Sequence, residues 1–208
     1  MIHPPPEPRR EPEPTIPGLP TDLRRWAREV VQIVVVTALL LLVVNTLVAQ
    51  PFEVQQRSME PALASGDHIL IDKLSMRWSP YGRGDVIVFH APGRYDAEGI
   101  PYVKRIVGMP GDTIQIENGR IYVTPAGGVP IRLDESYLVE GEASLPQGVE
   151  GRREWTVPEN AYFVLGDNRS ESVDSRTFGA IPHDRIVGRA WLRYLPIDRV
   201  RLIGTNEG

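Results

Sequence analysis

The stretch D-T-I-Q-I-E-N-G-R-I-Y-V, residues 112–123, indicates the fold class of this chain. Apolar and polar residues alternate on both sides of Asn118-Gly119, as they do in strands that bury one face. Asn-Gly supplies the two residues with positive φ that a type I′ turn requires. The stretch therefore predicts a β-hairpin.

Short apolar runs bounded by turn residues lie on both sides of this hairpin. They comprise residues 68–72, 85–90, 161–165, 189–195 and 199–203. Gly66-Asp67 and Gly84 are turn signals before the first two runs. Residues 93–99 and 141–151 are expected to be exposed loops, and the predicted β region shows no clear pattern of a soluble helix. We therefore predict a mainly β fold, an antiparallel sheet closed into a barrel or sandwich.

The composition excludes several function classes. The chain has no cysteine, which excludes disulfides, thiolate catalysis and cysteine zinc sites. Its four histidines show no short spacing of the kind that binds metals. The 23 basic and 27 acidic side chains give a net charge of −4, without a nucleic-acid-binding pattern. We expect no metal, no cofactor and no nucleic-acid partner.

A long apolar segment precedes the predicted β region. Residues 30–49, V-V-Q-I-V-V-V-T-A-L-L-L-L-V-V-N-T-L-V-A, contain no charge over 20 residues. A helix of this length spans roughly 30 Å of hydrocarbon. We predict a transmembrane helix over residues 26–49, with Trp26 at the interface. The alternative is a cleaved secretory signal, although its apolar region would be shorter and would end in a small-x-small site.

The charges around this segment predict its orientation. Arg24, Arg25 and Arg28 lie directly before the apolar run, and no lysine or arginine follows until Arg57. Because positive charges favour the cytoplasmic side, the N-terminus is predicted to be cytoplasmic. The β region is then extracytoplasmic.

The chain therefore divides into three predicted segments. Residues 1–25 are proline-rich and should form a disordered cytoplasmic tail. Residues 26–49 form the single membrane pass, which places the protein in the cell (inner) membrane. Residues 50–204 form the extracytoplasmic β domain.

Ser58 and Lys104 are the candidate catalytic residues. Ser58 lies in Q-Q-R-S-M-E-P-A-L, shortly after the apolar segment, and Lys104 lies in Y-V-K-R-I-V. Alternate side chains of a strand share a face, so either Lys104 or Arg105 must point with apolar neighbours. Burial lowers the pKa of a lysine, and a neutral amine can take the proton of a serine hydroxyl. The ordinary alternatives are a turn serine and an edge-strand lysine.

A polar cluster, G-D-N-R-S-E-S-V-D-S-R at 166–176, follows the apolar residues F-V-L and precedes F-G-A-I-P. The charged residues that can pair within it are Asp167, Arg169, Asp174 and Arg176. Such a network would fix the loop and hold the hydroxyl of Ser172 or Ser175 against a catalytic group. The alternative is a solvated loop.

In order along the chain, these motifs resemble those of bacterial type I signal peptidases, membrane-anchored serine proteases with a Ser-Lys dyad. The resemblance covers residues 50–195. S-M-E-P-A-L matches the nucleophile box, Y-V-K-R-I-V-G-M-P-G-D the lysine box, and the polar cluster with F-G-A-I-P the final box. The resemblance implies removal of signal peptides from exported preproteins after small-x-small sites. Its implied partners are preprotein signal peptides, membrane lipid and the secretion machinery.

The resemblance also implies roles for individual residues. Ser58 would attack the scissile carbonyl and form an acyl-enzyme, with Lys104 as the general base. Ser172 would orient the Lys104 amine. The supporting ionic scaffold would consist of Arg105, Asp167, Asp174 and Arg176.

Oxyanion and substrate contacts follow from the same resemblance. The oxyanion hole would use the Ser58 backbone N–H and a donor two residues earlier, where this chain has Gln56 rather than the family's serine or glycine. The substrate would lie extended between segments 52–56 and 102–104. The expected substrate-binding residues are Phe52, Val54, Met59, Leu63, Tyr102 and Val103.

Two other functions are consistent with parts of the sequence. Self-cleaving repressors use the same dyad, but they would need a DNA-binding helical module where this chain has its apolar segment. A catalytically silent, membrane-tethered β domain that binds peptides or partner proteins would be consistent with Gln56 and Arg57. That alternative predicts that Ser58→Ala leaves function unchanged.

Overall fold

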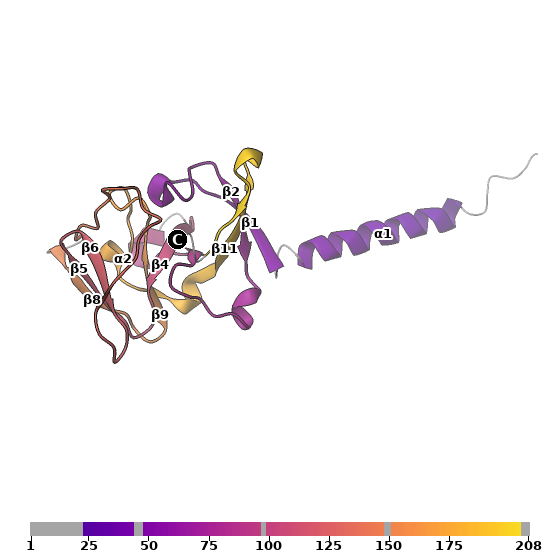
Figure 1. Ribbon diagram of the computed structural model, residues 1–208. Helices are drawn as coiled ribbons and strands as arrows, with labels where there is room; N and C mark the ends of the chain where they lie inside the picture. Colours follow the sequence, from indigo (N-terminus) through magenta and orange to yellow (C-terminus); the bar gives the residue numbers. More distant parts are fainter. Residues whose placement is uncertain (1–22, 44–47, 97–98, 148–150, 205–208) are drawn as a thin grey trace, which may run out of the picture. The chain divides into compact units, whose positions relative to one another are not determined.

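The computed structural model describes residues 23–43, 48–96, 99–147 and 151–204 (Figure 1). The chain forms two compact units, residues 1–42 and residues 43–208. Helix α1 (Leu23–Val43) accounts for the described part of the first unit, and the strands belong to the second, which we call the β unit.

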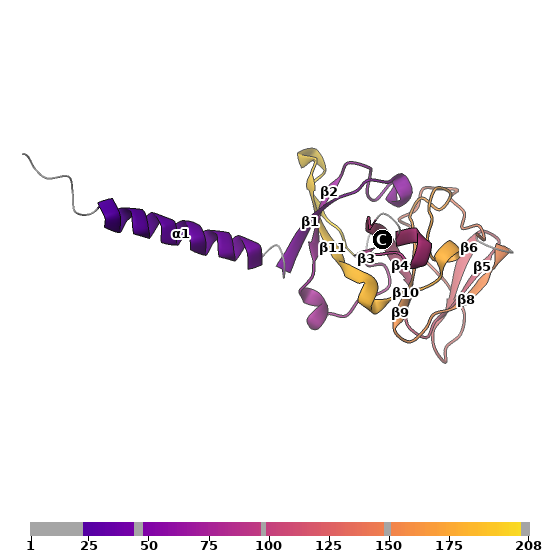
Figure 2. The ribbon, with the colours of Figure 1, turned by 180° about the vertical axis from the view of Figure 1, so that it is seen from behind.

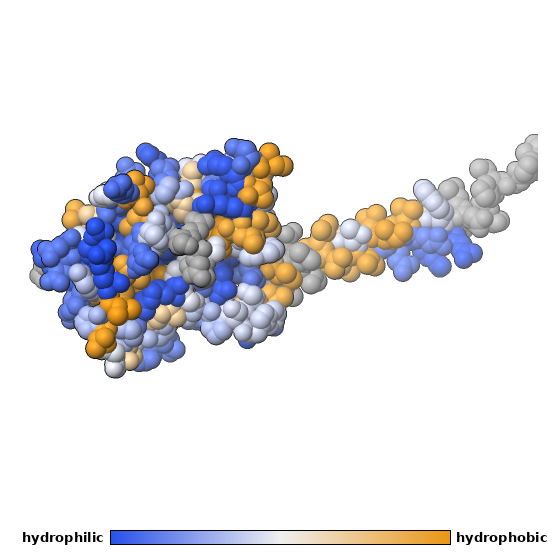
Figure 3. Space-filling view, in the orientation of Figure 1, coloured by the Kyte–Doolittle hydropathy of each residue, from blue (hydrophilic) through white to orange (hydrophobic). Residues whose placement is uncertain are grey.

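Helix α1 covers most of the predicted membrane segment. It begins at Leu23 and ends at Val43, and Ala49 already starts strand β1 (Ala49–Glu53), so the helix is shorter than the predicted span of 26–49. Figure 3 shows apolar residues along much of α1 and hydrophilic residues gathered at one end. Within the described ranges, no helix is both long enough and apolar enough to span a membrane. The membrane anchor stays a prediction.

The predicted disordered tail cannot be compared in full with the structure. Most of residues 1–25 lies outside the described residues. The last three residues of that range are helical, because α1 begins at Leu23.

The larger sheet of the β unit is antiparallel and has 8 strands. They are β1, β2 (His68–Asp72), β3 (Val86–Phe89), β4 (Tyr102–Gly108), β9 (Ala161–Leu165), β10 (Ile181–Pro182), β11 (Ile186–Leu195) and β12 (Arg201–Leu202). Their order is β1-β2-β11-β3-β4-β9-β10, with β12 on β11. Both ribbon views place β4 and β9 between the smaller sheet and β1, β2 and β11 (Figures 1 and 2).

The predicted hairpin forms the centre of the smaller, 4-stranded sheet. Its strands, in the order β7-β6-β5-β8, are β7 (Ile131–Arg132), β6 (Arg120–Thr124), β5 (Thr113–Glu117) and β8 (Glu154–Thr156). Asn118 and Gly119 have φ values of 50° and 75°, as the predicted type I′ turn requires. The mainly β prediction is therefore confirmed, as a curled antiparallel sheet with a smaller sheet beside it.

Short helical turns connect the strands of the β unit. They are η2 (Arg57–Met59), η3 (Ser75–Arg77), η4 (Gly93–Asp96), α2 (Ser175–Phe178), η6 (His183–Arg185) and η7 (Ile197–Arg199). Sequence analysis expected no helix in this region, and α2, with 4 residues, is too short to produce a helical periodicity. The Asp174 side chain caps α2 by accepting a hydrogen bond from the Arg176 N–H.

An apolar cluster fixes the turn that carries Ser58. Met59 and Leu63 are fully buried and pack with Val54, Ile71 and Val103. Burying such a side chain contributes about 1.5–3 kcal/mol. The residues that follow Ser58 are thus part of the core, so the position of η2 is set by core packing.

Candidate active site

Ser58 and Lys104 come together from separate elements of the β unit. Ser58 lies in η2, which follows the extended residue Gln56 (φ −125°, ψ 157°). Lys104 lies in β4 and is opposite Ile87 of β3 in the sheet register. Only 5% of Ser58 and 1% of Lys104 are exposed. The predicted nucleophile and base therefore share one buried environment.

The contact between the two side chains is direct. Lys104 Nζ donates hydrogen bonds to Ser58 Oγ at 2.6 Å and to the Val103 carbonyl oxygen at 2.9 Å. Nζ also lies 5.4 Å from the centroid of the Tyr102 ring. When the amine is neutral, its lone pair can accept the serine proton at the same separation. The geometry is that of a nucleophile and its general base.

Burial makes Lys104 a suitable base near neutral pH. It lowers the pKa of Lys104 from its usual 10.5 to about 8, because the ammonium loses its hydration. The carboxylates of Asp174 and Asp167 act in the opposite direction and favour the charged amine. With a pKa of about 8, roughly a tenth of the amine is neutral at pH 7.

Asn168 and Gly166, both from the polar cluster, contact the backbone around Ser58. The Asn168 backbone N–H donates to the Ser58 carbonyl oxygen at 3.1 Å, and its side-chain amide donates to the Arg57 carbonyl oxygen at 3.3 Å. A Cβ on Gly166 would lie 2.4 Å from the Ser58 oxygen and 2.3 Å from Ser172 Oγ. Only glycine fits at that position.

A buried ion pair joins β4 to the start of the polar cluster. Arg105 Nε and NH2 donate to the two carboxylate oxygens of Asp167 at 2.9 and 2.7 Å, and NH1 donates to the Gly84 carbonyl oxygen at 3.0 Å. The guanidinium also lies 4.2 Å from the Tyr137 ring centroid. This bidentate pair fixes the cluster against the strand that carries Lys104.

A second buried ion pair closes the far end of the cluster. Arg176 Nε and NH2 donate to Asp174 at 2.8 Å each, and NH2 also donates to the Arg169 carbonyl oxygen at 2.8 Å. Asp174 accepts a further hydrogen bond from the Gly166 N–H at 3.2 Å. The predicted charge network is therefore present, with Asp174–Arg176 inside the cluster and Asp167 paired to Arg105.

Ser172 lies at the site without making the predicted contact. It is 4% exposed, and its Oγ has no hydrogen-bond partner among the described residues. Lys104 Nζ donates to Ser58 and Val103 instead. The orienting role of Ser172 therefore stays a prediction. The other candidate hydroxyl, Ser175, accepts a hydrogen bond from the Val164 N–H at 2.9 Å and supports β9.

A narrow pocket of about 20 Å³ opens beside Ser58. Its lining residues are Phe52, Val54, Gln55, Gln56, Ser58, Met59, Ile100, Pro101, Tyr102 and Val103. All predicted substrate-binding residues except Leu63 line this pocket. Leu63 is fully buried in the core cluster and does not line this pocket, so its role in substrate binding stays a prediction. Gln56 is exposed close to Ser58 in the sequence, and its role as an oxyanion donor stays a prediction.

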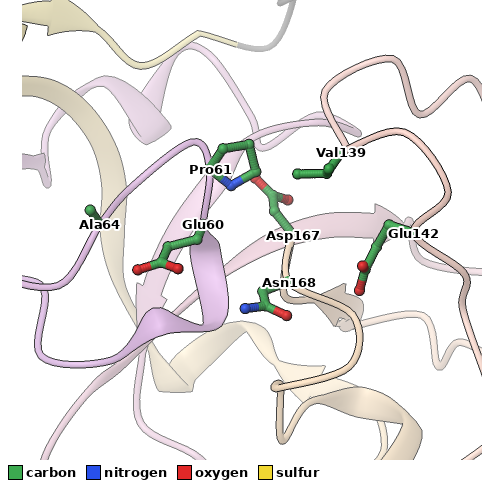
Figure 4. A pocket seen from close by; sticks show the side chains of 7 residues that line it. All are labelled: Glu60, Pro61, Ala64, Val139, Glu142, Asp167 and Asn168. Carbon is green, nitrogen blue, oxygen red and sulfur yellow. The ribbon is translucent and has the colours of Figure 1, made fainter.

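A wider pocket of about 440 Å³ lies on the other side of the turn after Ser58. It is lined by Glu60, Pro61, Ala64, Val139, Glu142, Asp167 and Asn168 (Figure 4). Glu60 and Glu142 come from separate segments, with Asn168 between them in the view of Figure 4. Glu142 accepts a hydrogen bond from the Ser170 N–H at 2.9 Å, which ties this wall to the polar cluster.

Sequence analysis missed several residues that support the site. Asn168 belongs to the polar cluster, and its position between Asp167 and Arg169 was the available signal. Arg169 was expected to pair within the cluster, but this fully buried side chain contacts Glu135 at 2.6 Å and the Tyr137 hydroxyl at 3.1 Å. The segment around Tyr137 carries no motif that indicates this contact.

Comparison with known proteins gives one consistent family. The family model described as signal peptidase, peptidase S26, matches residues 26–195. A signal peptidase I of Bacillus caldolyticus is 38% identical over 183 residues, which cover 83% of this chain and 91% of that protein.

A second relative agrees with this match. A probable signal peptidase I-2 of a Synechocystis species is 35% identical over 171 residues, which cover 81% of this chain and 73% of that protein. The crystal structure of a signal peptidase I from Enterococcus faecalis aligns with a TM-score of 0.41 at 30% identity, covering 53% of this chain and 97% of that chain.

Proposed function

Because the chain belongs to the S26 family of signal peptidases and is therefore a serine endopeptidase that removes signal peptides, we propose that Ser58 is its nucleophile and Lys104 its general base. The observation that carries this proposal is the 2.6 Å contact between Lys104 Nζ and Ser58 Oγ inside the protein. A lysine with a pKa of about 8 can act as a base without a histidine.

In the proposed mechanism, Ser58 Oγ attacks the carbonyl carbon of the scissile peptide bond while its proton moves to neutral Lys104 Nζ. The C–N bond then breaks, and Lys104 returns the proton to the leaving amine. This leaves the signal peptide esterified to Ser58. Lys104 next takes a proton from a water molecule that attacks the ester, and Ser58 Oγ regains a proton as the ester bond breaks.

The oxyanion would be stabilised by the backbone N–H of Ser58 and by a donor from Gln56. The Gln56 side-chain amide can donate hydrogen bonds, and Gln56 lines the same pocket as Ser58. Losing one donor of an oxyanion hole typically reduces the rate about 10²- to 10³-fold. A change of Gln56 should therefore lower kcat far more than it lowers stability, because Gln56 is exposed.

The supporting residues act by positioning. Asp167 and Arg105 hold the polar cluster against β4, and Asp174 and Arg176 close its far end. Ser172 would orient the Lys104 amine through a hydrogen bond while Nζ keeps its contact with Ser58 Oγ. These groups touch neither the scissile bond nor the leaving amine in the proposed mechanism.

The sheet edges support substrate binding by strand addition. β4 pairs with β9 only from Arg105 onward, and β1 is the terminal strand of its sheet. Residues 102–104 thus have backbone groups directed away from β3 that an extended peptide can use. The narrow pocket has room for about one water-sized group, which suits a side chain as small as that of alanine.

We also propose that residues 26–49 tether the protein to the cell (inner) membrane, with the N-terminus cytoplasmic. The uncharged run at 30–49 and the arginines before it support this topology. A tether would keep Ser58 close to the membrane face at which signal peptides emerge. Preprotein signal peptides are the substrates in this account, and contact with the secretion machinery would follow from the shared location.

The test is cleavage of a preprotein with an Ala-x-Ala site by the full chain in detergent. We expect cleavage by the wild type and none above background by Ser58→Ala or Lys104→Ala. Ser79→Ala and Lys73→Ala are matched controls at other positions and should cleave. The value of kcat/KM should rise about tenfold from pH 7 to pH 9 as Lys104 loses its proton. Cleavage by Ser58→Ala at the wild-type rate would contradict the proposal.

A further inference from the structure

A larger pocket adjoins the narrow pocket beside Ser58. It has a volume of about 450 Å³. Its lining residues are Gln55, Gln56, Arg94, Tyr95, Ile100, Pro101 and Tyr102, and we call it the Arg94 pocket. Apart from Arg94 and Tyr95, all of them also line the narrow pocket. A ligand that occupies the narrow pocket can therefore extend a side chain into the Arg94 pocket.

The two pockets share five lining residues and differ in the others. Val54 and Val103 line the narrow pocket but not the Arg94 pocket, and both pack in the core cluster that contains Met59. Tyr102 precedes Val103 on β4 and packs against a different apolar cluster, so its side chain points to the opposite face. Tyr102 lines both pockets, whereas Val103 is absent from the Arg94 pocket.

This arrangement assigns substrate positions to the pockets. Successive side chains of an extended peptide point to opposite faces. If positions −1 and −3 face the narrow pocket, position −2 must face the other way, toward the Arg94 pocket. The Arg94 pocket is also far larger than the narrow one, so it can take a long side chain.

The polar groups of the Arg94 pocket favour a negatively charged ligand. Arg94 is exposed, and its NH2 donates to the Tyr95 hydroxyl at 3.0 Å while its guanidinium lies 5.1 Å from the Tyr95 ring centroid. The Tyr95 ring packs on Phe178, with 5.7 Å between centroids. The remaining polar side chains of the lining are the amides of Gln55 and Gln56, and no carboxylate lines the pocket among the residues that the structure describes.

We propose that the Arg94 pocket binds the side chain at position −2 of the signal peptide and prefers glutamate to lysine there. The inference rests on the proposed peptidase function. It adds a specificity-determining residue, Arg94, that acts through charge and is separate from the Ser58–Lys104 pair.

The experiment compares preprotein substrates with Ala at −1 and −3 and with Ala, Glu, Gln or Lys at −2. For the wild type, we expect kcat/KM to be about fivefold higher with Glu than with Lys, since an exposed ion pair changes affinity about two- to fivefold. Arg94→Glu should reverse the order, and Arg94→Gln should bring the ratio near one. The wild-type ratio should fall toward one in about 0.5 M salt, because salt screens exposed charges.

Arg120→Glu is the matched control, since Arg120 is exposed on the smaller sheet and undergoes the same change of charge. In this control variant, the ratio of kcat/KM for the Glu substrate to kcat/KM for the Lys substrate should equal that of the wild type. A wild-type ratio of one, with the Ala substrate cleaved, would overturn the role of Arg94 and leave the proposed peptidase function intact. An unchanged ratio in Arg94→Glu would overturn it as well. Failure to cleave any of the substrates would instead contradict the proposed function.

Discussion

Replacing Lys104 by methionine should abolish cleavage and remove a pH-dependent destabilisation of the fold. Methionine keeps an unbranched side chain of similar length and lacks the amine. Lys104 is 1% exposed, so the wild type must hold an ammonium without water whenever the amine is protonated. The methionine variant has no such group, and its stability should therefore differ from the wild type by an amount that depends on pH.

The size of this effect follows from the pKa of Lys104. Burial lowers that pKa from 10.5 to about 8, and each tenfold change in the proton equilibrium corresponds to about 1.4 kcal/mol. The folded protein therefore carries a penalty of about 3 kcal/mol below pH 8, where both states are protonated. Between pH 8 and 10.5 the unfolded state binds more protons, so wild-type stability rises with pH through this window. Above pH 10.5 the penalty is gone.

The assay is urea unfolding of the wild type and Lys104→Met, as full chains in the same detergent, from pH 7 to pH 11. The difference in unfolding free energy, variant minus wild type, should fall by about 3 kcal/mol over that range. Other titrating groups are common to both proteins and cancel in the difference. Lost hydrogen bonds of the amine shift the difference at every pH without changing its slope. A difference that is constant with pH would refute the conclusion that burial lowers the pKa of Lys104.

Two further substitutions test the scaffold around the dyad. Gly166→Ala should lower kcat/KM for preprotein cleavage about 100-fold, because the added Cβ would lie 2.3 Å from Ser172 Oγ and displace the loop. The control is Gly82→Ala, whose added Cβ would have its nearest neighbour at 4.0 Å and whose kcat/KM should stay close to that of the wild type. Asp167→Ala should lower the unfolding free energy by about 3–5 kcal/mol, measured by urea unfolding, because it leaves the Arg105 guanidinium buried without its partner. Wild-type stability in Asp167→Ala would contradict the importance of this pair.

Local patterns predicted the longer strands because these have a simple alternation or an apolar run, whereas β7, β8 and β10 have only two or three residues and show no pattern. The predicted runs at 68–72 and 161–165 coincide with β2 and β9. Asn118-Gly119 specified its turn through backbone sterics alone, which needs no tertiary information. Helix α2 was not predicted because its 4 residues are too few to show a helical periodicity. The cap by the Asp174 side chain stabilises its first turn.

The site was harder to predict wherever a residue's role depends on packing. Ser58 and Lys104 were found from chemistry and order along the chain, and the fold brings them together. Leu63 has the same apolar character as Val54 and packs in the same core cluster, but only Val54 also lines the narrow pocket, and no local pattern distinguishes the two. Arg94 was not singled out because it lies in an expected loop. Only the folded structure brings it to the same pocket as Gln56 and Tyr102.

The most direct test of the dyad is detection of the acyl-enzyme. The full chain should be mixed with a preprotein carrying an Ala-x-Ala site, quenched in acid within one turnover, digested and analysed by mass spectrometry. We predict that the peptide containing Ser58 carries the C-terminal part of the signal peptide as an ester, and that Lys104→Met gives no such adduct. Cleavage of the preprotein with no adduct on Ser58 at any quench time, together with cleavage by Ser58→Ala, would contradict the account.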